Sequence, residues 1–93
     1  MPNFEKFEIS QVAALIRDNK VLILEDSAHP GQYVIPGGRI DAQEDPQRAF
    51  ARELEEEISI THFKNLGLVD VDAWYRRDGS SCAAHCYLIE NNE

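Results

Sequence analysis

Only one stretch of this 93-residue chain has the periodicity of a helix, and that limits its fold more than any other feature. Asp45 and Pro46 form a helix start, with Asp as the N-cap and Pro at the first helical position. Phe50, Leu54 and Ile58 then recur every four residues as an apolar stripe. A single amphipathic helix must bury its stripe against another element, so the rest of the chain has to supply a sheet.

The other apolar runs have strand character and are joined by turn residues. Asp18-Asn19-Lys20 lies between the first two runs, and Asp78-Gly79 lies between the last two, so both ends of the chain predict a β-hairpin of buried strands. Pro36-Gly37-Gly38 stops the third run, and residues 39–44 read as a loop. The predicted strands cover residues 9–17, 21–24, 32–35, 66–73 and 82–90.

Composition places the chain among soluble globular proteins. With 43% hydrophobic and 28% charged residues, residues 1–93 are predicted to form a single ordered domain. No apolar run approaches the roughly 20 residues of a membrane helix, and the N-terminus lacks the pattern of a signal peptide. Two cysteines are too few for a disulfide framework. We therefore expect a reduced, cytoplasmic protein with no membrane contact.

Cys82, His85 and Cys86 invite a zinc interpretation, which the predicted strand strongly disfavours. On a strand, His85 faces opposite to the two cysteines, so the three side chains do not converge on one ion.

The net charge of −8 is concentrated in one segment. Between Glu44 and Glu57, six acidic residues and two arginines give a net charge of −4. The chain has no cluster of Lys and Arg, so no stable binding to nucleic acid is expected. An acidic protein can still bind an anionic ligand when metal cations bridge the two.

The helix gathers part of this charge on one face. At about 100° per residue, Glu53, Glu56 and Glu57 share a face while Glu55 points to the opposite side. Hard carboxylate oxygens at this spacing suit Mg²⁺ or Mn²⁺. A solvated acidic helix face is the alternative when these three residues are taken alone. The glycines at 37 and 38 favour a site, because they let backbone approach a metal or phosphate closely.

The spacing of these residues resembles the Nudix box of the Nudix (MutT-like) hydrolases. The family pattern is Gly-x5-Glu-x7-Arg-Glu-U-x-Glu-Glu-x-Gly-U, where U is a bulky aliphatic residue. The chain departs from it at Ser59, which replaces glycine at a helix end where positive φ is often wanted. The matching residues are Gly38, Glu44, Arg52, Glu53, Leu54, Glu56, Glu57 and Ile60.

The resemblance implies an α/β/α sandwich around a mixed β-sheet and a divalent-metal-dependent pyrophosphohydrolase. Its substrate would be a nucleoside diphosphate linked to another group, such as a nucleoside triphosphate or a nucleotide sugar. Carried over to this chain, Glu53, Glu56, Glu57 and the Gly37 carbonyl would bind Mg²⁺ or Mn²⁺.

The resemblance also implies roles for the residues around the carboxylates. Glu53 would alternatively orient or deprotonate the attacking water, Arg52 would orient the carboxylates, and Glu44 would brace them from the loop; these three form the predicted catalytic group. The predicted substrate contacts are Gly38, Arg39 and Tyr33. Tyr33, like Trp74 and Tyr75, is able to stack on a base, with packing within the fold as the open alternative.

The number of predicted elements leaves one face of the sheet without helical cover. Because a Nudix domain usually continues through another strand and a second helix, we expect this domain to be incomplete on its C-terminal side. A homodimer would be another way to cover the open face. A catalytically impaired Nudix domain that binds nucleotides or a protein partner is the alternative function.

Overall fold

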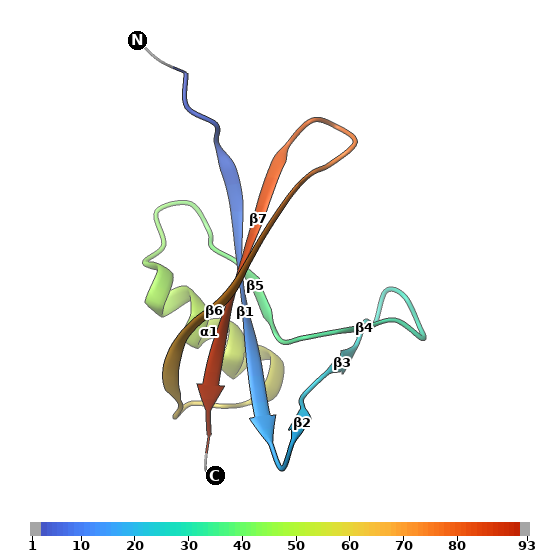
Figure 1. Ribbon diagram of the computed structural model, residues 1–93, viewed down its shortest axis with the longest axis vertical. Helices are drawn as coiled ribbons and strands as arrows, with labels where there is room; N and C mark the ends of the chain where they lie inside the picture. Colours follow the sequence, from blue (N-terminus) through green and yellow to red (C-terminus); the bar gives the residue numbers. More distant parts are fainter. Residues whose placement is uncertain (1–2, 92–93) are drawn as a thin grey trace.

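The computed structural model describes residues 3–91, which form a mixed sheet with one helix packed against it (Figure 1). Asn92 and Glu93, after which a further strand and helix were expected to be missing, lie outside the described residues. The elements in chain order are β1 (Phe7–Arg17), β2 (Lys20–Val21), β3 (Leu24–Glu25), β4 (Tyr33–Val34), β5 (Gly37–Arg39), α1 (Pro46–Ile58), β6 (Lys64–Tyr75) and β7 (Ser81–Glu90).

The long strands pair in the order β2-β1-β7-β6, and β5 pairs with β1. β1 runs parallel to β7, whereas β6 is antiparallel to β7 and β5 is antiparallel to β1. The predicted mixed sheet is therefore confirmed, as is the hairpin at the C-terminal end. Its turn is closed by a 2.9 Å hydrogen bond in which the Arg76 N–H donates to the Ser80 carbonyl.

The hairpin predicted for residues 9–24 is only partly correct. β2 pairs with β1 at two positions, and its Val21 is about half exposed rather than buried. The chain then leaves β1, and β3 pairs with β4 as a separate small sheet. The physical reason is that β2 and the segment leading into β5 compete for the same edge of β1. β5 pairs with β1 from Ser10 to Val12, and the Ala13 N–H donates to the Pro36 carbonyl at 2.8 Å. The glycines predicted to stop a strand are thus themselves paired with β1.

The helix begins and ends where the sequence predicted. Asp45 is the N-cap, and its Oδ2 accepts a 3.0 Å hydrogen bond from the Arg48 N–H. Ser59 takes the left-handed conformation at the C-cap with φ of 58°. The apolar stripe packs onto the sheet, and the buried core consists of Ala13, Leu15, Phe50, Leu54 and Ile89.

The opposite face of the sheet has no helical cover among residues 3–91, in which α1 is the one helix. The sheet's edge strand β6 is exposed along almost its whole length. No helix in this described part of the chain combines the length and hydropathy that a membrane crossing requires.

Candidate functional site

The contact between α1 and β5 brings Glu53 onto the glycine pair. Gly38 lies opposite Gln11 in the β1–β5 ladder, on the side of the sheet that α1 covers. A Cβ atom on Gly38 would lie 2.3 Å from the carboxyl carbon of Glu53. The absence of a side chain at Gly38 is therefore what lets the Glu53 carboxylate lie directly over β5.

Glu57, one helical turn after Glu53, reaches the same strand. Its Oε2 accepts a 3.1 Å hydrogen bond from the Gly37 N–H. The expectation for Gly37 concerned its carbonyl as a metal ligand, whereas the contact in the structure is made by its N–H. Two of the three predicted helix carboxylates thus meet the two glycines.

Arg52 connects the remaining predicted residues. Its Nε and Nη2 donate to both carboxylate oxygens of Glu44 at 2.8 and 2.9 Å. Its Nη1 donates to Glu53 Oε1 at 3.1 Å and to Glu56 Oε2 at 3.3 Å. One guanidinium therefore links the loop before α1 to two of the carboxylates on the helix, which is the arrangement a planar fork of donors allows.

Asp41 belongs to the same network and was not singled out from the sequence. Its N–H donates to Glu44 Oε1 at 3.1 Å, and its carboxylate lies 3.6 Å from Arg52 Nη2. Its position three residues before Glu44 was the available signal, because short loops often fold back through contacts at this separation. Both oxygens of the Glu44 carboxylate therefore accept hydrogen bonds, and these bonds hold the loop before α1 in place.

The environments of the two partly buried carboxylates push their pKa values apart. Burial raises the pKa of Glu53, an effect that Arg52 opposes. Hydrogen bonds from Arg52 lower the pKa of Glu44, with a smaller contribution from the Asp41 N–H. The same contact with Glu44 raises the pKa of Arg52. Glu44 is therefore a fixed anion, while Glu53 is the better proton acceptor of the two.

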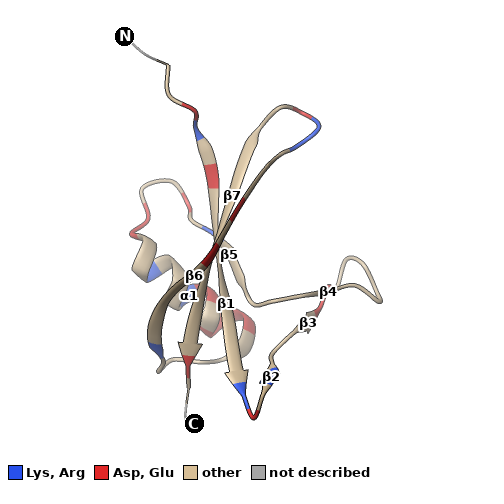
Figure 2. Cartoon of the chain, viewed as in Figure 1, with Lys and Arg blue, Asp and Glu red and all other residues tan. Residues whose placement is uncertain are grey.

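The donor set suits a hard divalent cation in its chemistry. Every candidate ligand is an oxygen, and acidic segments gather on α1 and on the loop before it (Figure 2). Within residues 3–91 no three metal-binding side chains converge as a ready coordination sphere. Arg52 engages one oxygen each of Glu53 and Glu56. Carboxylates at the ends of flexible side chains can turn toward a cation. The residues therefore fit a divalent metal, because they are carboxylates and share one face of the helix.

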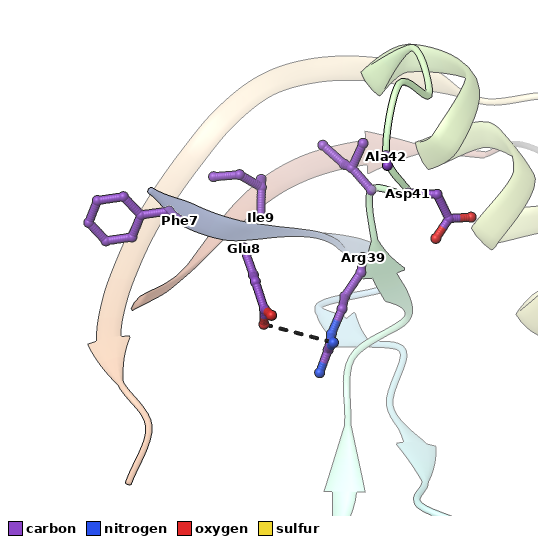
Figure 3. Close-up of a pocket in the computed structure, with 7 residues that line it drawn as sticks. Phe7, Glu8, Ile9, Arg39, Asp41 and Ala42 are labelled. Atoms are coloured by element: carbon purple, nitrogen blue, oxygen red, sulfur yellow. Dashed lines mark ion pairs between the residues drawn. The ribbon is translucent and has the colours of Figure 1, made fainter. Parts of the chain in front are cut away.

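Arg39, a predicted substrate contact, lies on the other side of β5 from Glu53. Figure 3 shows its side chain directed toward Glu8 of β1, and its Nη1 lies 3.8 Å from Glu8 Oε2. Arg76 donates to the same oxygen at 2.6 Å. Glu8 was not identified from the sequence, because only the fold brings β1 beside these two arginines. A cavity of about 480 Å³ adjoins the pair and is lined by Phe7, Glu8, Ile9, Arg39, Ile40, Asp41 and Ala42.

The aromatic residues considered for base stacking belong to β4 and β6, whereas the carboxylates belong to α1 and the loop before it. Tyr33 is on β4 and largely exposed, and Trp74 and Tyr75 end β6. Cys82, His85 and Cys86 lie on the continuous strand β7, and both cysteines are free thiols. Cys82 Sγ lies 3.8 Å from Glu8 Oε2, the same oxygen that Arg39 approaches.

Comparison with known protein families adds a match over almost the whole chain. Residues 8–92 match the family described as "NUDIX domain". A rat protein, diphosphoinositol polyphosphate phosphohydrolase 2 of Rattus norvegicus, is 36% identical over 44 residues. That match covers 47% of this chain and 25% of the rat protein, so it reaches a quarter of the relative's length.

Solved structures show the same fold. The MutT NUDIX hydrolase from Burkholderia pseudomallei is 28% identical with a TM-score of 0.73, and the match covers 94% of this chain and 69% of that one. A NUDIX hydrolase from Nitrosomonas europaea is 20% identical with a TM-score of 0.75, covering 91% and 59%. The mixed sheet and single helix described here therefore correspond to a known arrangement.

Proposed function

Since the chain belongs to the NUDIX domain family, we propose that it hydrolyses a phosphoric anhydride bond in a nucleoside diphosphate linked to another group. The observation that carries this proposal is the meeting of Glu53 and Glu57 with Gly37 and Gly38. It brings two of the carboxylates proposed as metal ligands together against β5. The family match and the fold likeness support the reaction class.

Glu53, Glu56 and Glu57 would hold Mg²⁺ or Mn²⁺, which when bound neutralises phosphate charge and lowers the pKa of an attacking water. Arg52 positions Glu53 and Glu56 and sets their orientation through its contact with Glu44. Alternatively, Glu53 would not bind the ion and would instead orient the attacking water or accept its proton. Gly38 keeps the path to that carboxylate free of a side chain.

Three further assignments belong to the same proposal. Residues 1–93 act as one Nudix unit, Gly38, Arg39 and Tyr33 contact substrate, and the protein works in the cytoplasm. The cytoplasmic assignment rests on the composition of the chain, which has too few cysteines for a disulfide framework. A nucleotide-binding module without catalysis is the competing reading of the same site.

A hydrolysis screen tests the proposal. The protein is incubated with nucleoside triphosphates, nucleotide sugars and a diphosphoinositol polyphosphate, each with Mg²⁺, with Mn²⁺ or with EDTA. The last substrate is included because of the name of the rat relative. We expect phosphate-bond cleavage that needs the divalent ion and stops in EDTA. Nucleotide binding with no cleavage in either metal would favour the binding module instead.

A further inference from the structure

β6 forms an open edge of the sheet within residues 3–91. The strand order ends at β6 on one side, whereas β1 pairs with β2 and β5 on the other. Every residue of β6 except Gly67 is exposed. An edge strand offers a row of backbone N–H and C=O groups to any strand that lies beside it. The outer side of β6 is therefore able to accept a further strand.

The second half of β6 lacks the features that usually protect an edge strand. Pairing with β7 is regular from Asp70 to Tyr75, because both register shifts lie earlier in the strand. This regular segment contains no proline and no lysine. Native edge strands commonly use bulges, proline or lysine to prevent pairing with another chain. The segment from Asp70 to Tyr75 is therefore the part of β6 best suited to pair.

Opposite charges lie near the two ends of this segment, on one side of the sheet. Alternate residues of a strand share a side, so Asp70 and Trp74 point the same way. Trp74 and Glu8 both pair with Cys82 and therefore share that side too. Arg76 donates to Glu8 Oε2 at 2.6 Å, which places its guanidinium there as well. An acid and a base thus flank one face of a short strand segment.

A second copy of the same segment, running antiparallel, satisfies both charges at once. In a two-fold contact, residues at equal distances from the axis along the strand face each other. With Ala73 at the axis, Asp70 faces the partner's Arg76, and Val71 faces the partner's Tyr75. Opposed Cβ atoms of antiparallel strands lie roughly 5 Å apart, which lets the charged ends meet. The two-fold contact therefore makes the same ion pair twice.

The charges of β6 disfavour neighbouring registers. With Asp72 at the axis, the two Asp72 carboxylates face each other, and with Val71 at the axis, Asp70 faces the partner's Asp72. Like charges directly opposite each other destabilise a strand pair. With Trp74 at the axis, Asp72 faces the partner's Arg76, but fewer residues pair before the turn. The charge pattern of β6 is thus complementary to a second copy of itself in one favoured register.

We infer that two copies of this chain associate through β6, antiparallel and centred on Ala73, to form one continuous sheet. α1 lies against β1 and β5, so this pairing leaves the carboxylate face of the helix uncovered and is independent of the proposed hydrolysis. One strand segment buries less surface than a standard protein interface, so the dimer is weak and depends on concentration.

Charge reversal in two separate variants tests the register. Asp70→Arg sets an arginine against the partner's Arg76, and Arg76→Asp sets an aspartate against the partner's Asp70. Each variant alone should therefore raise the dissociation constant of the dimer at least about tenfold. In an equal mixture the two variants meet with opposite charges at both positions, so the dimer should return. Sedimentation velocity over a range of concentrations measures the association. Glu25→Arg, the same charge change on β3, is the control and should leave the dimer intact.

Hydrogen exchange of the wild-type protein provides a measurement that needs no variant. Backbone amides of residues 70–76 should exchange more slowly at high protein concentration than at low, whereas those of β2 should not change. A wild-type monomer at every concentration, single variants that associate as tightly as wild type, or no recovery in a mixture of folded variants would overturn the inference. Concentration-dependent protection confined to another surface would overturn it as well.

Discussion

Arg52 is the residue on which the geometry of the carboxylates depends most. It makes four hydrogen bonds to three glutamates, two of them to Glu44. A lysine keeps the charge but cannot reproduce the planar fork. We expect Arg52→Lys to lower the free energy of unfolding only slightly, since the pairs are exposed to solvent and screened by it.

Urea unfolding of Arg52→Lys measures that loss, and kcat in the hydrolysis assay should fall with it because Glu53 and Glu56 lose their common partner. Arg48→Lys, an exposed position on the same helix, is the control. If both variants behave alike, Arg52 does not organise the site.

The free energy of unfolding should depend on whether Glu44 is ionised. Arg52 holds the pKa of Glu44 below its ordinary value of 4.5. Because the folded-state pKa is the lower one, the ionised carboxylate stabilises the fold above the unfolded-state pKa, and this contribution is lost as the pH falls through the folded-state pKa. Wild type should exceed Glu44→Gln in stability near neutral pH. The difference should shrink as the pH is lowered from about 5 to about 3.

Urea unfolding at a series of pH values measures that difference. A gap between the two proteins that stays constant over the range would contradict the assigned Arg52–Glu44 contact.

The two glycines of β5 should respond differently to substitution. A Cβ on Gly37 would lie 2.1 Å from the backbone carbonyl oxygen of Gln11, which cannot move aside without breaking the ladder. Gly37→Ala should therefore lower the free energy of unfolding by about 3 kcal/mol. At Gly38 the Cβ would meet the end of the Glu53 side chain, which is able to turn away.

Gly38→Ala should thus keep the stability nearly unchanged and reduce kcat at least about tenfold through the displaced carboxylate. Unfolding and hydrolysis measured on both variants separate the two effects. Equal losses of stability would show that the Glu53 carboxylate does not lie over Gly38.

Among the elements, α1 was the most predictable, because its signals are local. Asp45, Pro46 and the four-residue apolar repeat fixed its start, its end and its buried face. Strand pairing was less predictable, since it depends on which segment competes for an edge. Residues 21–24 have the composition of a strand, but their pairing with β1 stops early: the Ala13 N–H, which Leu24 would meet in the same register, donates to the Pro36 carbonyl instead. Glu8 went unnoticed for the same reason: its partners Arg39 and Arg76 come from distant segments.

The end of α1 carries a strained residue. Ser59 has φ of 58°, and its N–H donates to the Glu55 carbonyl at 3.0 Å. Glycine adopts this conformation without the steric cost of a Cβ, so Ser59→Gly should raise the free energy of unfolding by up to about 1 kcal/mol. Thermal unfolding measures it, with Ser27→Gly in an exposed loop as the control. A lower melting temperature for Ser59→Gly would contradict the assigned strain.

At the scale of the whole molecule, β6 presents the largest run of exposed apolar side chains. Leu68, Val69 and Val71 are each more than half exposed on this edge strand. Such a surface promotes association, and we propose a homodimer as one arrangement that would cover it. Light scattering should show concentration-dependent association that Val71→Lys weakens. Val21→Lys, on β2 at the far side of the sheet, is the control. Equal association of the two variants would exclude β6 as the contact.

The proposed phosphohydrolase site draws its carboxylates from one face of α1. Glu57 contacts β5, whereas Glu55 is an exposed residue of the same helix two positions away. The most direct test is kcat/KM in Mg²⁺ for Glu57→Gln and Glu55→Gln. The site described here predicts a loss of about 100-fold or more for Glu57→Gln and a change within about threefold for Glu55→Gln. Similar losses for the two variants, or full activity in Glu57→Gln, would contradict the account.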